Sequence, residues 1–453
     1  MLSEQVHTAL ELSEPASFAR LSEHLPMAWI EQALAATGTA SVRRRRLPAE
    51  QVVWLVIALA LYRHQSIPDV LETLAVPMLS EQVHTALELS EPASFARLSE
   101  HLPMAWIEQA LAATGTASVR RRRLPAEQVV WLVIALALYR HQSIPDVLET
   151  LDLALPNDAS ACVSKSGIAQ ARERLGDKPL LWLFEQTARA WVAQDAAHYK
   201  WKGLALYAMD GTTFRTADSP ENRLYFGAQS YASGKVASYP QVRGVSLTAV
   251  PTHLVADIAF GRYGCNEMLY AKPLIERIPD DSLTIFDKGF LAAEILWGLR
   301  MGRSERHFLI PAKKNLQWEL LSGSADDGIV QMKVSPQARR KNPALPETWT
   351  ARAIRDEESE RVLLTSLTDR RRFKAADILA CYRRRWEIET SYRELKQTML
   401  GAELTLRSRQ PEGVHQEIWG ALIAYNLVRL EMAKAALEAR VEPTDLSLCW
   451  PCA

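Results

Sequence analysis

Three acidic residues of this 453-residue chain occupy positions from which their carboxylates could converge on metal ions. Asp210 and Asp287 each follow an apolar run that predicts a β-strand, and each precedes a small-residue turn. In an open α/β sheet, ligands gather at the carboxyl ends of the strands. Together with Glu389, these aspartates would supply the hard oxygen ligands that Mg²⁺ or Mn²⁺ prefers. Two such ions could activate a water or a 3′-hydroxyl and stabilise a departing oxygen.

Glu389 differs from its neighbours in the predicted helix Cys381–Met399, a segment with five basic residues and three glutamates. At about 100° per residue, Glu389 shares a face roughly 80° wide with an aromatic hydroxyl and three cations. These side chains are Tyr382, Arg385, Arg393 and Lys396. Glu387 and Glu394 fall about 120–140° from Tyr382, away from that face. The pattern predicts cations that hold DNA phosphates around one carboxylate that binds metal.

Each of these residues also has a simpler interpretation. A single aspartate after a strand commonly forms a turn, and a charged helix is commonly a solvated helix with i,i+4 ion pairs. The presence of all three carboxylates together, in this order of strands and helices, favours the metal site over the simpler interpretations.

The elements around these residues predict an α/β fold. LALYAMDG, VRGVSLTAV, HLVADIAFG, DSLTIFDKGF and RHFLIPA indicate strands, the first of them ending at Asp210 and the fourth at Asp287. Residues 266–278 and 291–301 are predicted helices between them. The order of strands and helices suits a mixed sheet with helices on its faces. Between residues 313 and 372, the runs GIVQMKV, TARAIR and RVLLTSLT indicate a β-rich insertion. Residues 419–438 form a strongly apolar predicted helix.

An exact duplication precedes this region, since residues 1–74 recur unchanged as residues 78–151. Solenoid repeats diverge and need several units, so two identical copies indicate a recent duplication, and we expect the second copy to be the native one. Each copy is predicted to be largely helical, with a basic run just before an apolar helix: in the second copy Arg120, Arg121, Arg122 and Arg123. This run could grip phosphates or be a solvated charge cluster. The expected divisions are residues 1–77 (redundant helical copy), 78–195 (helical DNA-contacting domain), 196–409 (catalytic domain) and 410–453 (C-terminal helix and tail).

Composition excludes several other classes. The net charge is zero, which argues against a uniformly basic coat, although residues 361–409 carry twelve Lys and Arg against six Asp and Glu. The five scattered cysteines do not form a disulfide framework and suit a reducing cytoplasm. A redox role for Cys449 and Cys452 is remote, because no βαβ unit surrounds them. The longest apolar run has eleven residues, Val52–Tyr62, so no membrane span is expected.

The spacing from Tyr382 through Arg385 and Glu389 to Lys396 resembles the tyrosine–arginine–glutamate–lysine signature of bacterial insertion-sequence transposases of the DDE class, the insertion-sequence-four family. MDGTTFRT around Asp210 and FDKGF around Asp287 resemble the two aspartate motifs of that family. YPQVR, TLRSR, WGALIAYNLVR, RRRRLP and QARERLG resemble further family segments. The match covers roughly residues 78–440.

The resemblance implies a ribonuclease-H-like mixed-sheet core with a β-rich insertion. It further implies cut-and-paste transposition of an insertion sequence with Mg²⁺ or Mn²⁺, two ions being expected. The implied partners are double-stranded DNA, as terminal repeats and as target, and a second protomer in a homodimer on paired ends. An aromatic residue of the insertion could stack on a flipped base, with Trp318 and Trp349 as candidates beside a core or surface role. A cytoplasmic, nucleoid-associated protein is expected.

The chain departs from the family pattern in its extra N-terminal copy and in its ending, LSLCWPCA, which suggests truncation. The alternative function is therefore an impaired DNA-binding remnant that binds element ends or inhibits an intact transposase. A third possibility is a general nuclease of the same fold, without specificity for ends.

Overall fold

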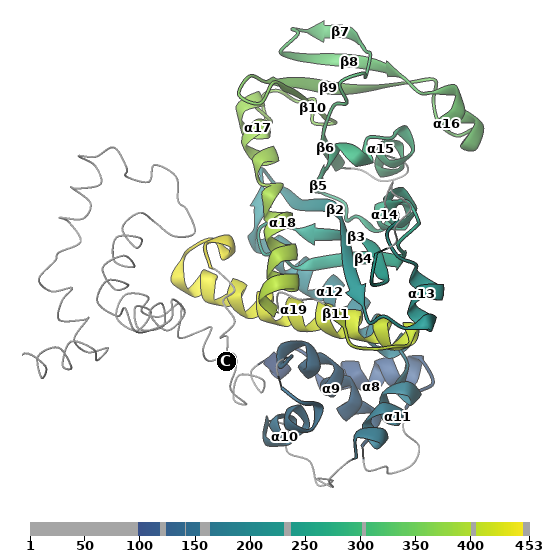
Figure 1. Cartoon of the computed structure of the whole chain (residues 1–453). Helices are drawn as coiled ribbons and strands as arrows, with labels where there is room; N and C mark the ends of the chain where they lie inside the picture. Colours follow the sequence, from purple (N-terminus) through teal and green to yellow (C-terminus); the bar gives the residue numbers. More distant parts are fainter. Residues whose placement is uncertain are drawn as a thin grey trace, which may run out of the picture. The chain divides into compact units, whose positions relative to one another are not determined.

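The computed structural model describes residues 98–117, 124–140, 142–154, 164–230, 237–300, 305–399 and 405–446, all within the second of two compact units, residues 90–453 (Figure 1). The first copy of the duplication, the arginine run 120–123 and the tail 447–453 lie outside the described residues. The described part consists of a group of helices followed by a large mixed sheet with helices on both of its faces.

The first helices of this unit are α8 (Met104–Ala113), α9 (Ala126–Leu138), α10 (Ile144–Ala154), α11 (Lys165–Leu175) and α12 (Lys178–His198). Pro125 precedes α9 as its N-cap, as expected for a helix start. The N-cap of α11 is Ser164, whose hydroxyl accepts a hydrogen bond from the Gly167 amide, 3.2 Å away. The apolar α9 is buried along most of its length and packs against the long C-terminal helix α19 (Pro411–Ala439). The predicted apolar helix near residues 419–438 is thus confirmed and is longer than its apolar run.

Within the described residues the sheet contains eleven strands, and its main order is β4-β3-β2-β5-β6-β10-β9-β8-β7. The strands of the first part are β2 (Leu204–Thr216), β3 (Gln241–Ala249), β4 (Val255–Arg262), β5 (Ser282–Phe286) and β6 (Arg306–Pro311). β3 runs antiparallel to β2 and β4 runs antiparallel to β3, whereas β5 and β6 run parallel to β2. Two short strands, β1 (Lys200–Trp201) and β11 (Thr405–Leu406), also pair with β2.

The predicted β-rich runs between residues 313 and 372 continue this same sheet. They form β7 (Glu319–Gly323), β8 (Asp327–Lys333), β9 (Thr348–Asp356) and β10 (Arg361–Thr365). β10 pairs antiparallel with β6, so the added strands extend the edge of the sheet. β7, which has all of its residues exposed, was absent from the sequence prediction because ELLSG has no clear alternating apolar pattern.

The remaining helices are short except for α14 (Glu267–Arg277). They are α13 (Pro220–Phe226), α15 (Ala293–Arg300), α16 (Pro336–Lys341), α17 (Ala375–Arg383) and α18 (Trp386–Arg393), with 3₁₀ turns η1 (Lys288–Phe290) and η3 (Pro443–Asp445) and a π-helical turn η2 (Glu394–Met399). The predicted helices near 266–278 and 291–301 are confirmed as α14 and α15. Pro273 is accommodated inside α14, which is continuous.

The two faces of β2 bury different partners, because successive side chains of a strand point to opposite sides. Leu204, Leu206 and Ala208 form one buried cluster with Ile378 of α17 and Ile388 of α18. The α17–α18 pair therefore covers the face of the sheet toward which Leu206 and Ala208 point, and by the same alternation Asp210 points toward it too.

A buried ion pair stabilises the extended end of the sheet. Arg352 of β9 is fully buried, and its Nε and Nη2 atoms each lie 2.7 Å from the carboxylate oxygens of Asp327. Its Nη1 atom donates to the carbonyl oxygens of Leu367 and Phe373, at 3.3 and 2.7 Å. Every nitrogen of the guanidinium thus donates a hydrogen bond, which is the condition under which a buried charge is tolerated.

We expect Asp327→Asn to lower the free energy of unfolding by about 2–4 kcal/mol, because it leaves the buried Arg352 without its counter-charge. The matched control is Asp326→Asn, which removes an exposed ion pair to Arg355 at 3.1 Å and should change stability by less than about 0.5 kcal/mol. Urea unfolding of the two variants measures the difference. Equal midpoints would contradict a stabilising role for the buried pair.

Candidate active site

Asp210 and Asp287 lie next to each other where the parallel pairing of β2 with β5 ends. The last paired residues of β2 and β5 are Met209 and Phe286, so the two aspartates are the next residue of each strand. Asp210 Oδ1 accepts a hydrogen bond from the Gly211 amide at 2.7 Å, and Asp287 Oδ2 accepts one from Gly289 at 3.2 Å as the N-cap of η1. These local bonds fix both carboxylates at the sheet edge.

The prediction that β2 ends at Asp210 was wrong. The strand runs on to Thr216, because β3 pairs with it as far as Arg215 and β11 pairs with its last two residues. Only the pairing with β5 stops at Met209. Asp210 therefore stands where β5 leaves β2, beside an otherwise continuous strand.

The segment that carries Glu389 is divided into two helices and a π turn, and not the single helix that the sequence predicted. Between α17 and α18 the amides of Arg384 and Arg385 bond to carbonyls three residues back, both at 3.0 Å. Such a tight turn nearly superimposes side chains that are three residues apart. Tyr382 consequently lies over Arg385, whereas Glu389 follows Arg385 by the four residues of a normal α-helical turn.

Arg385 connects the helix to the strand. Its Nη2 atom donates to Glu389 Oε1 at 2.9 Å, and its Nη1 atom lies 3.8 Å from Asp210 Oδ2. The side chain is 14% exposed, so this bridging charge is largely shielded from water. Two carboxylates from elements far apart in the sequence thus meet around one guanidinium.

The electrostatics of this site are coupled. The pKa of Asp210 is raised to about 6, mainly by burial. The hydrogen bond from the Gly211 amide and the charge of Arg385 lower this pKa, whereas the nearby carboxylates of Asp287 and Glu267 raise it. Burial also raises the pKa of Tyr382, whose environment includes Arg385 and Asp287. Asp210, Asp287, Tyr382, Arg385 and Glu389 therefore form one interacting group. The structure brings together these five of the residues selected from the sequence.

Lys396 also reaches this group, from the π turn that follows α18. Burial lowers the pKa of Lys396 to about 8, and Asp210 acts in the opposite direction. Its Nζ atom lies 5.3 Å from the ring centre of Tyr392 and 5.7 Å from that of Phe214. A π turn is wider than an α turn and is frequently found at functional sites. Arg393, in contrast, is exposed, and Tyr392 rather than Arg393 contacts the strand, by a hydrogen bond from its hydroxyl to the Asp210 carbonyl at 2.7 Å.

The sequence predicts that Lys396 binds DNA, and we expect such a contribution to disappear as the pH rises through about 8, because the amine is charged only below its lowered pKa. Lys396→Arg keeps its charge at every accessible pH, so it should retain more affinity than the wild type at pH 9 and match it at pH 7. Fluorescence anisotropy with end-sequence DNA in EDTA measures both. The same loss between pH 7 and 9 in both proteins would refute this explanation.

The donor atoms at this site suit a hard divalent cation, since the carboxylates come from Asp210, Asp287 and Glu389 and soft ligands are not among them. As arranged, however, no group of three or more His, Cys, Asp or Glu residues among the described residues is gathered closely enough to hold a metal ion. Arg385 lies between Asp210 and Glu389 and accounts for their separation.

Two residues beside the site were not selected from the sequence. The carboxylate of Glu267, the first residue of α14, lies so close to Gly211 that a Cβ atom there would approach it to 2.7 Å. Trp386 is 61% exposed, and the Arg385 guanidinium carbon is 5.1 Å from its ring centre. The Glu267 contact has no local sequence signal, because it joins residues more than fifty positions apart. The position of Trp386 immediately after Arg385 could have indicated an exposed aromatic ring at the site.

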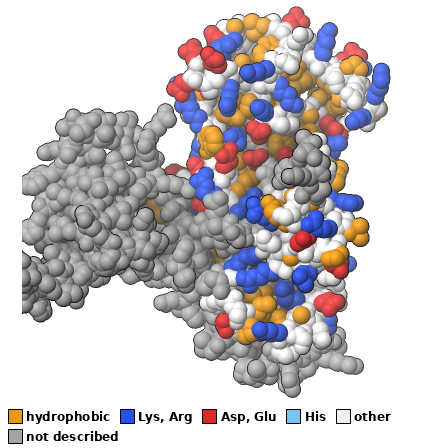
Figure 2. Space-filling model, in the orientation of Figure 1, with side chains coloured by type: hydrophobic (Ala, Val, Ile, Leu, Met, Phe, Trp, Pro, Cys, Tyr) orange, Lys and Arg blue, Asp and Glu red, His pale blue; other side chains and the backbone are white. Residues whose placement is uncertain are grey.

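The other sequence candidates fall elsewhere. Trp318 is 36% exposed in the segment before β7, and Trp349 of β9 packs against Phe308 with ring centres 6.1 Å apart. Arg120–Arg123 lie outside the described residues, so their role stays a prediction. The described basic residues group differently: Figure 2 shows Lys and Arg side chains gathered over the region of β11, where Arg407 donates a hydrogen bond to the Arg140 carbonyl.

Comparison with known families defines the class. The family described as "Transposase DDE domain" matches residues 201–427, and the family "Insertion element 4 transposase N-terminal" matches residues 15–90 and again 92–185. The chain is therefore a DDE transposase, an enzyme that cuts and transfers DNA. It belongs to the insertion-sequence-4 family of these enzymes.

Individual relatives agree with this assignment. The chain is 40% identical over 359 residues to transposase InsG of insertion sequence element IS4 from Escherichia coli K12, which covers 78% of this chain and 80% of the relative. It is 36% identical over 245 residues to the putative transposase InsZ from the same organism, covering 53% and 80%. A weak similarity, with a TM-score of 0.38 and 10% identity over 77% and 76% of the chains, links it to a piggyBac transposase synaptic complex with hairpin DNA.

The family expectation is thus confirmed, as is the mixed α/β fold. A DDE transposase domain implies DNA binding and a general dependence on divalent metal ions. None of the helices in the described ranges is both long and apolar enough to cross a bilayer.

Proposed function

We propose that this transposase performs cut-and-paste transposition with Asp210, Asp287 and Glu389 as its metal-binding catalytic carboxylates. The observation that carries the proposal is the meeting of β2, β5 and α18: two aspartates in adjacent strand positions, and a glutamate joined to one of them through Arg385. Carboxylates from separate elements converge in this way when a site must hold cations against phosphate oxygens.

We further propose that the core is ribonuclease-H-like. The support is its strand order, in which an antiparallel meander β2-β3-β4 is followed by β5 and β6, parallel to β2 and on its other side. A helix that crosses back after these strands supplies the third carboxylate. The strands β7 to β10 then correspond to the family's β-rich insertion before the glutamate.

Two Mg²⁺ or Mn²⁺ ions at this site would activate a water or 3′-hydroxyl and stabilise the leaving oxygen. The surrounding side chains have distinct tasks. Arg385, already shared by Asp210 and Glu389, and Lys396 would neutralise the scissile phosphate. Tyr382 stands beside Arg385 and Asp287 as a hydroxyl donor to a phosphate oxygen. The steps would be nicking at the element end, attack by the freed 3′-hydroxyl and strand transfer.

The proposed partners are the terminal repeats, the target DNA and a second protomer that binds the other end. Contacts outside the catalytic site support an extended DNA surface. Arg172 and Arg409 line a pocket of about 690 Å³ between α11 and the start of α19, and Arg140 and Arg407 meet near β11. Cations spread along such a path bind phosphates and set the register of a duplex.

Cleavage of linear DNA that carries the element's own terminal repeats tests the proposal. The full chain should produce nicks with 3′-hydroxyl ends in Mg²⁺ and none in EDTA, and DNA with scrambled ends should be cut at least about tenfold more slowly. Binding of the ends without cleavage would instead identify an impaired remnant. Equal cleavage of both DNAs would identify a general nuclease.

A further inference from the structure

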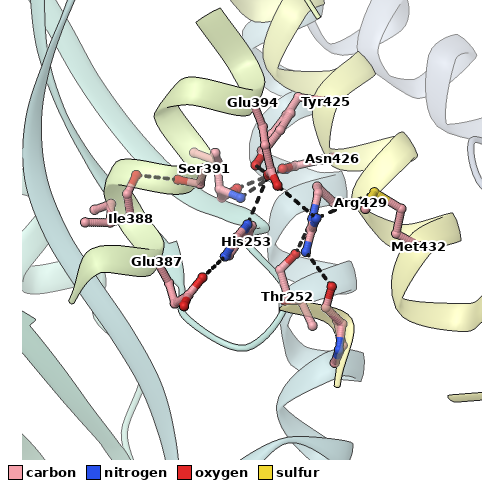
Figure 3. A network of polar contacts seen from close by, with 12 residues as sticks. Thr252, His253, Glu387, Ile388, Ser391, Glu394, Tyr425, Asn426, Arg429 and Met432 are labelled. Carbon is pink, nitrogen blue, oxygen red and sulfur yellow. Dashed lines mark hydrogen bonds and ion pairs between the residues drawn. The ribbon is translucent and has the colours of Figure 1, made fainter. Parts of the chain in front are cut away.

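A buried histidine contacts the two glutamates that flank Glu389 in the sequence (Figure 3). His253 occupies the turn between β3 and β4 and is 1% exposed. Its Nε2 atom lies 3.0 Å from a carboxylate oxygen of Glu387, and its Nδ1 atom lies 3.0 Å from one of Glu394. The helical angles calculated from the sequence placed Glu387 and Glu394 on a different face from Glu389. In the structure both of these glutamates contact the same residue, His253.

The turn that presents His253 is fixed to α19. The Arg429 side chain donates to the Thr252 carbonyl at 2.7 Å, and the Asn426 amide exchanges two hydrogen bonds of 2.9 Å with the backbone of Val255. The His253 backbone adopts a left-handed conformation with φ of 62°, which is uncommon for a residue other than glycine. A strained residue with such supports is held in place by its surroundings.

Both contacts of the ring require a donated proton, because an ionised carboxylate only accepts hydrogen bonds. A ring with protons on both nitrogens would donate to Glu387 and Glu394 at once. Burial alone would raise the pKa of Glu394, but Arg429, His253 and Tyr425 outweigh it and hold the pKa near 2. Tyr425 donates to Glu394 at 2.8 Å, and Arg429 lies 3.5 Å from it. Three side chains, of His253, Tyr425 and Arg429, thus converge on the Glu394 carboxylate.

The network holds the glutamate helix at two points along its axis. Glu387 and Glu394 are seven residues apart, which is about two helical turns, and Glu389 lies between them on another face. Two attachments on one side fix the rotation of a helix about its own axis. A rotation of about 10° would move a carboxylate some 6 Å from the axis by about 1 Å, and a displacement of that size can lower a reaction rate about a hundredfold.

We propose that His253 is a positioning residue for Glu389, which it serves by fixing the rotation of α18 through Glu387 and Glu394. The inference rests on the proposed catalytic role of Glu389. It assigns a function to the contacts of His253 with Glu387 and Glu394, which lie 134 and 141 positions further along the chain. These contacts are on the face of the helix that does not meet DNA or metal.

The test compares full-length His253→Gln with His307→Gln. His307 of β6 hydrogen-bonds Ser366 and Glu305 at 3.1 and 3.2 Å and does not touch α18, so it is a matched histidine control.

In His253→Gln, hydrogen–deuterium exchange of residues 386–399 should become at least about tenfold faster. The Mn²⁺ concentration for half-saturation, measured by electron paramagnetic resonance, should rise about tenfold. Cleavage at saturating DNA should fall about a hundredfold, while the affinity for end DNA stays within about twofold. His307→Gln should match the wild type in all four measurements.

Glu387 provides a second pair of variants in case His253→Gln does not fold, since its side chain is 31% exposed. Glu387→Leu should change the same quantities in the same directions, with the logarithm of each fold-change about half of that in His253→Gln. Glu387→Gln should restore wild-type behaviour, because a neutral ring can keep its Nδ1 proton toward Glu394 and accept at Nε2 from the new amide.

Wild-type exchange and Mn²⁺ affinity in His253→Gln and Glu387→Leu would overturn the proposal. These two readouts do not depend on cleavage, so they decide it even if the chain does not cut DNA. Failure of the catalytic assignment would look different, because Glu389→Gln would then retain both cleavage and Mn²⁺ binding.

Discussion

Glu389→Gln is expected to lower metal-dependent cleavage of end DNA by about a thousandfold or more. The substitution keeps the size of the side chain and can keep one hydrogen bond to Arg385, but it removes the charge that a divalent cation requires. The affinity for end DNA should stay within about threefold, because Arg385 and Lys396 remain in place. Rates at saturating DNA, with Mg²⁺ titrated from micromolar to millimolar concentrations, measure the effect.

The matched control is Glu358→Gln. Glu358 makes an exposed ion pair to Arg383 of α17 at 2.8 Å, so the same chemical change is made close in the fold but away from the site. Its cleavage rate should stay within about twofold of the wild type, because exposed pairs contribute little. A comparable loss in both variants, or activity in Glu389→Gln, would refute the assignment of Glu389.

Asp210→Asn is expected to abolish cleavage to a similar extent while it leaves the protein equally stable or more stable at pH 7. Burial raises the pKa of Asp210 to about 6, which means that the folded state favours the protonated, neutral carboxyl. Asparagine resembles this neutral form. Between pH 4 and 6 the folded protein binds more protons than the unfolded chain, so the wild type loses stability as the pH rises through this range.

Asp257 of β4 is a close structural counterpart. Its Oδ1 atom accepts a hydrogen bond from the next amide, Ile258, at 2.8 Å, it pairs with Arg277 at 3.0 Å, and burial raises its pKa to about 6. Register places Asp257 opposite Leu247, whereas Ser246 pairs with Asp210, so the two aspartates point to opposite faces of the sheet.

Asp257→Asn should therefore flatten the stability profile between pH 4 and 6 as Asp210→Asn does, yet keep cleavage within about threefold. Thermal unfolding at several pH values and the end-cleavage assay separate the two effects. If Asp257→Asn were also inactive, loss of cleavage would reflect disturbance of the sheet and not removal of a catalytic carboxylate.

The helical face of Glu389 illustrates what the local pattern can predict. Tyr382, Arg385 and Lys396 lie on the same side as Glu389, although the segment consists of two helices and a π turn and not of one helix. The tight turn before α18 and the π turn after it change the helical rotation in opposite directions, so a face calculated for an ideal helix is retained. Arg393, the last residue of α18, fell on the calculated face but is exposed, and its neighbour Tyr392 makes the contact with the strand.

The chain's own sequence predicted most of the strands, the position of Asp210 and Asp287 after apolar runs, and the separation of Glu389 from Glu387 and Glu394, because alternation and helical periodicity are local properties. Only the tertiary structure decided that β2 continues past Asp210, that Arg385 bridges Asp210 and Glu389, and that His253 meets Glu387 of α18 and Glu394 of the π turn. These features depend on which distant strand or side chain completes a hydrogen bond. Such pairings arise from the packing of the whole sheet and leave no periodic signal in one segment.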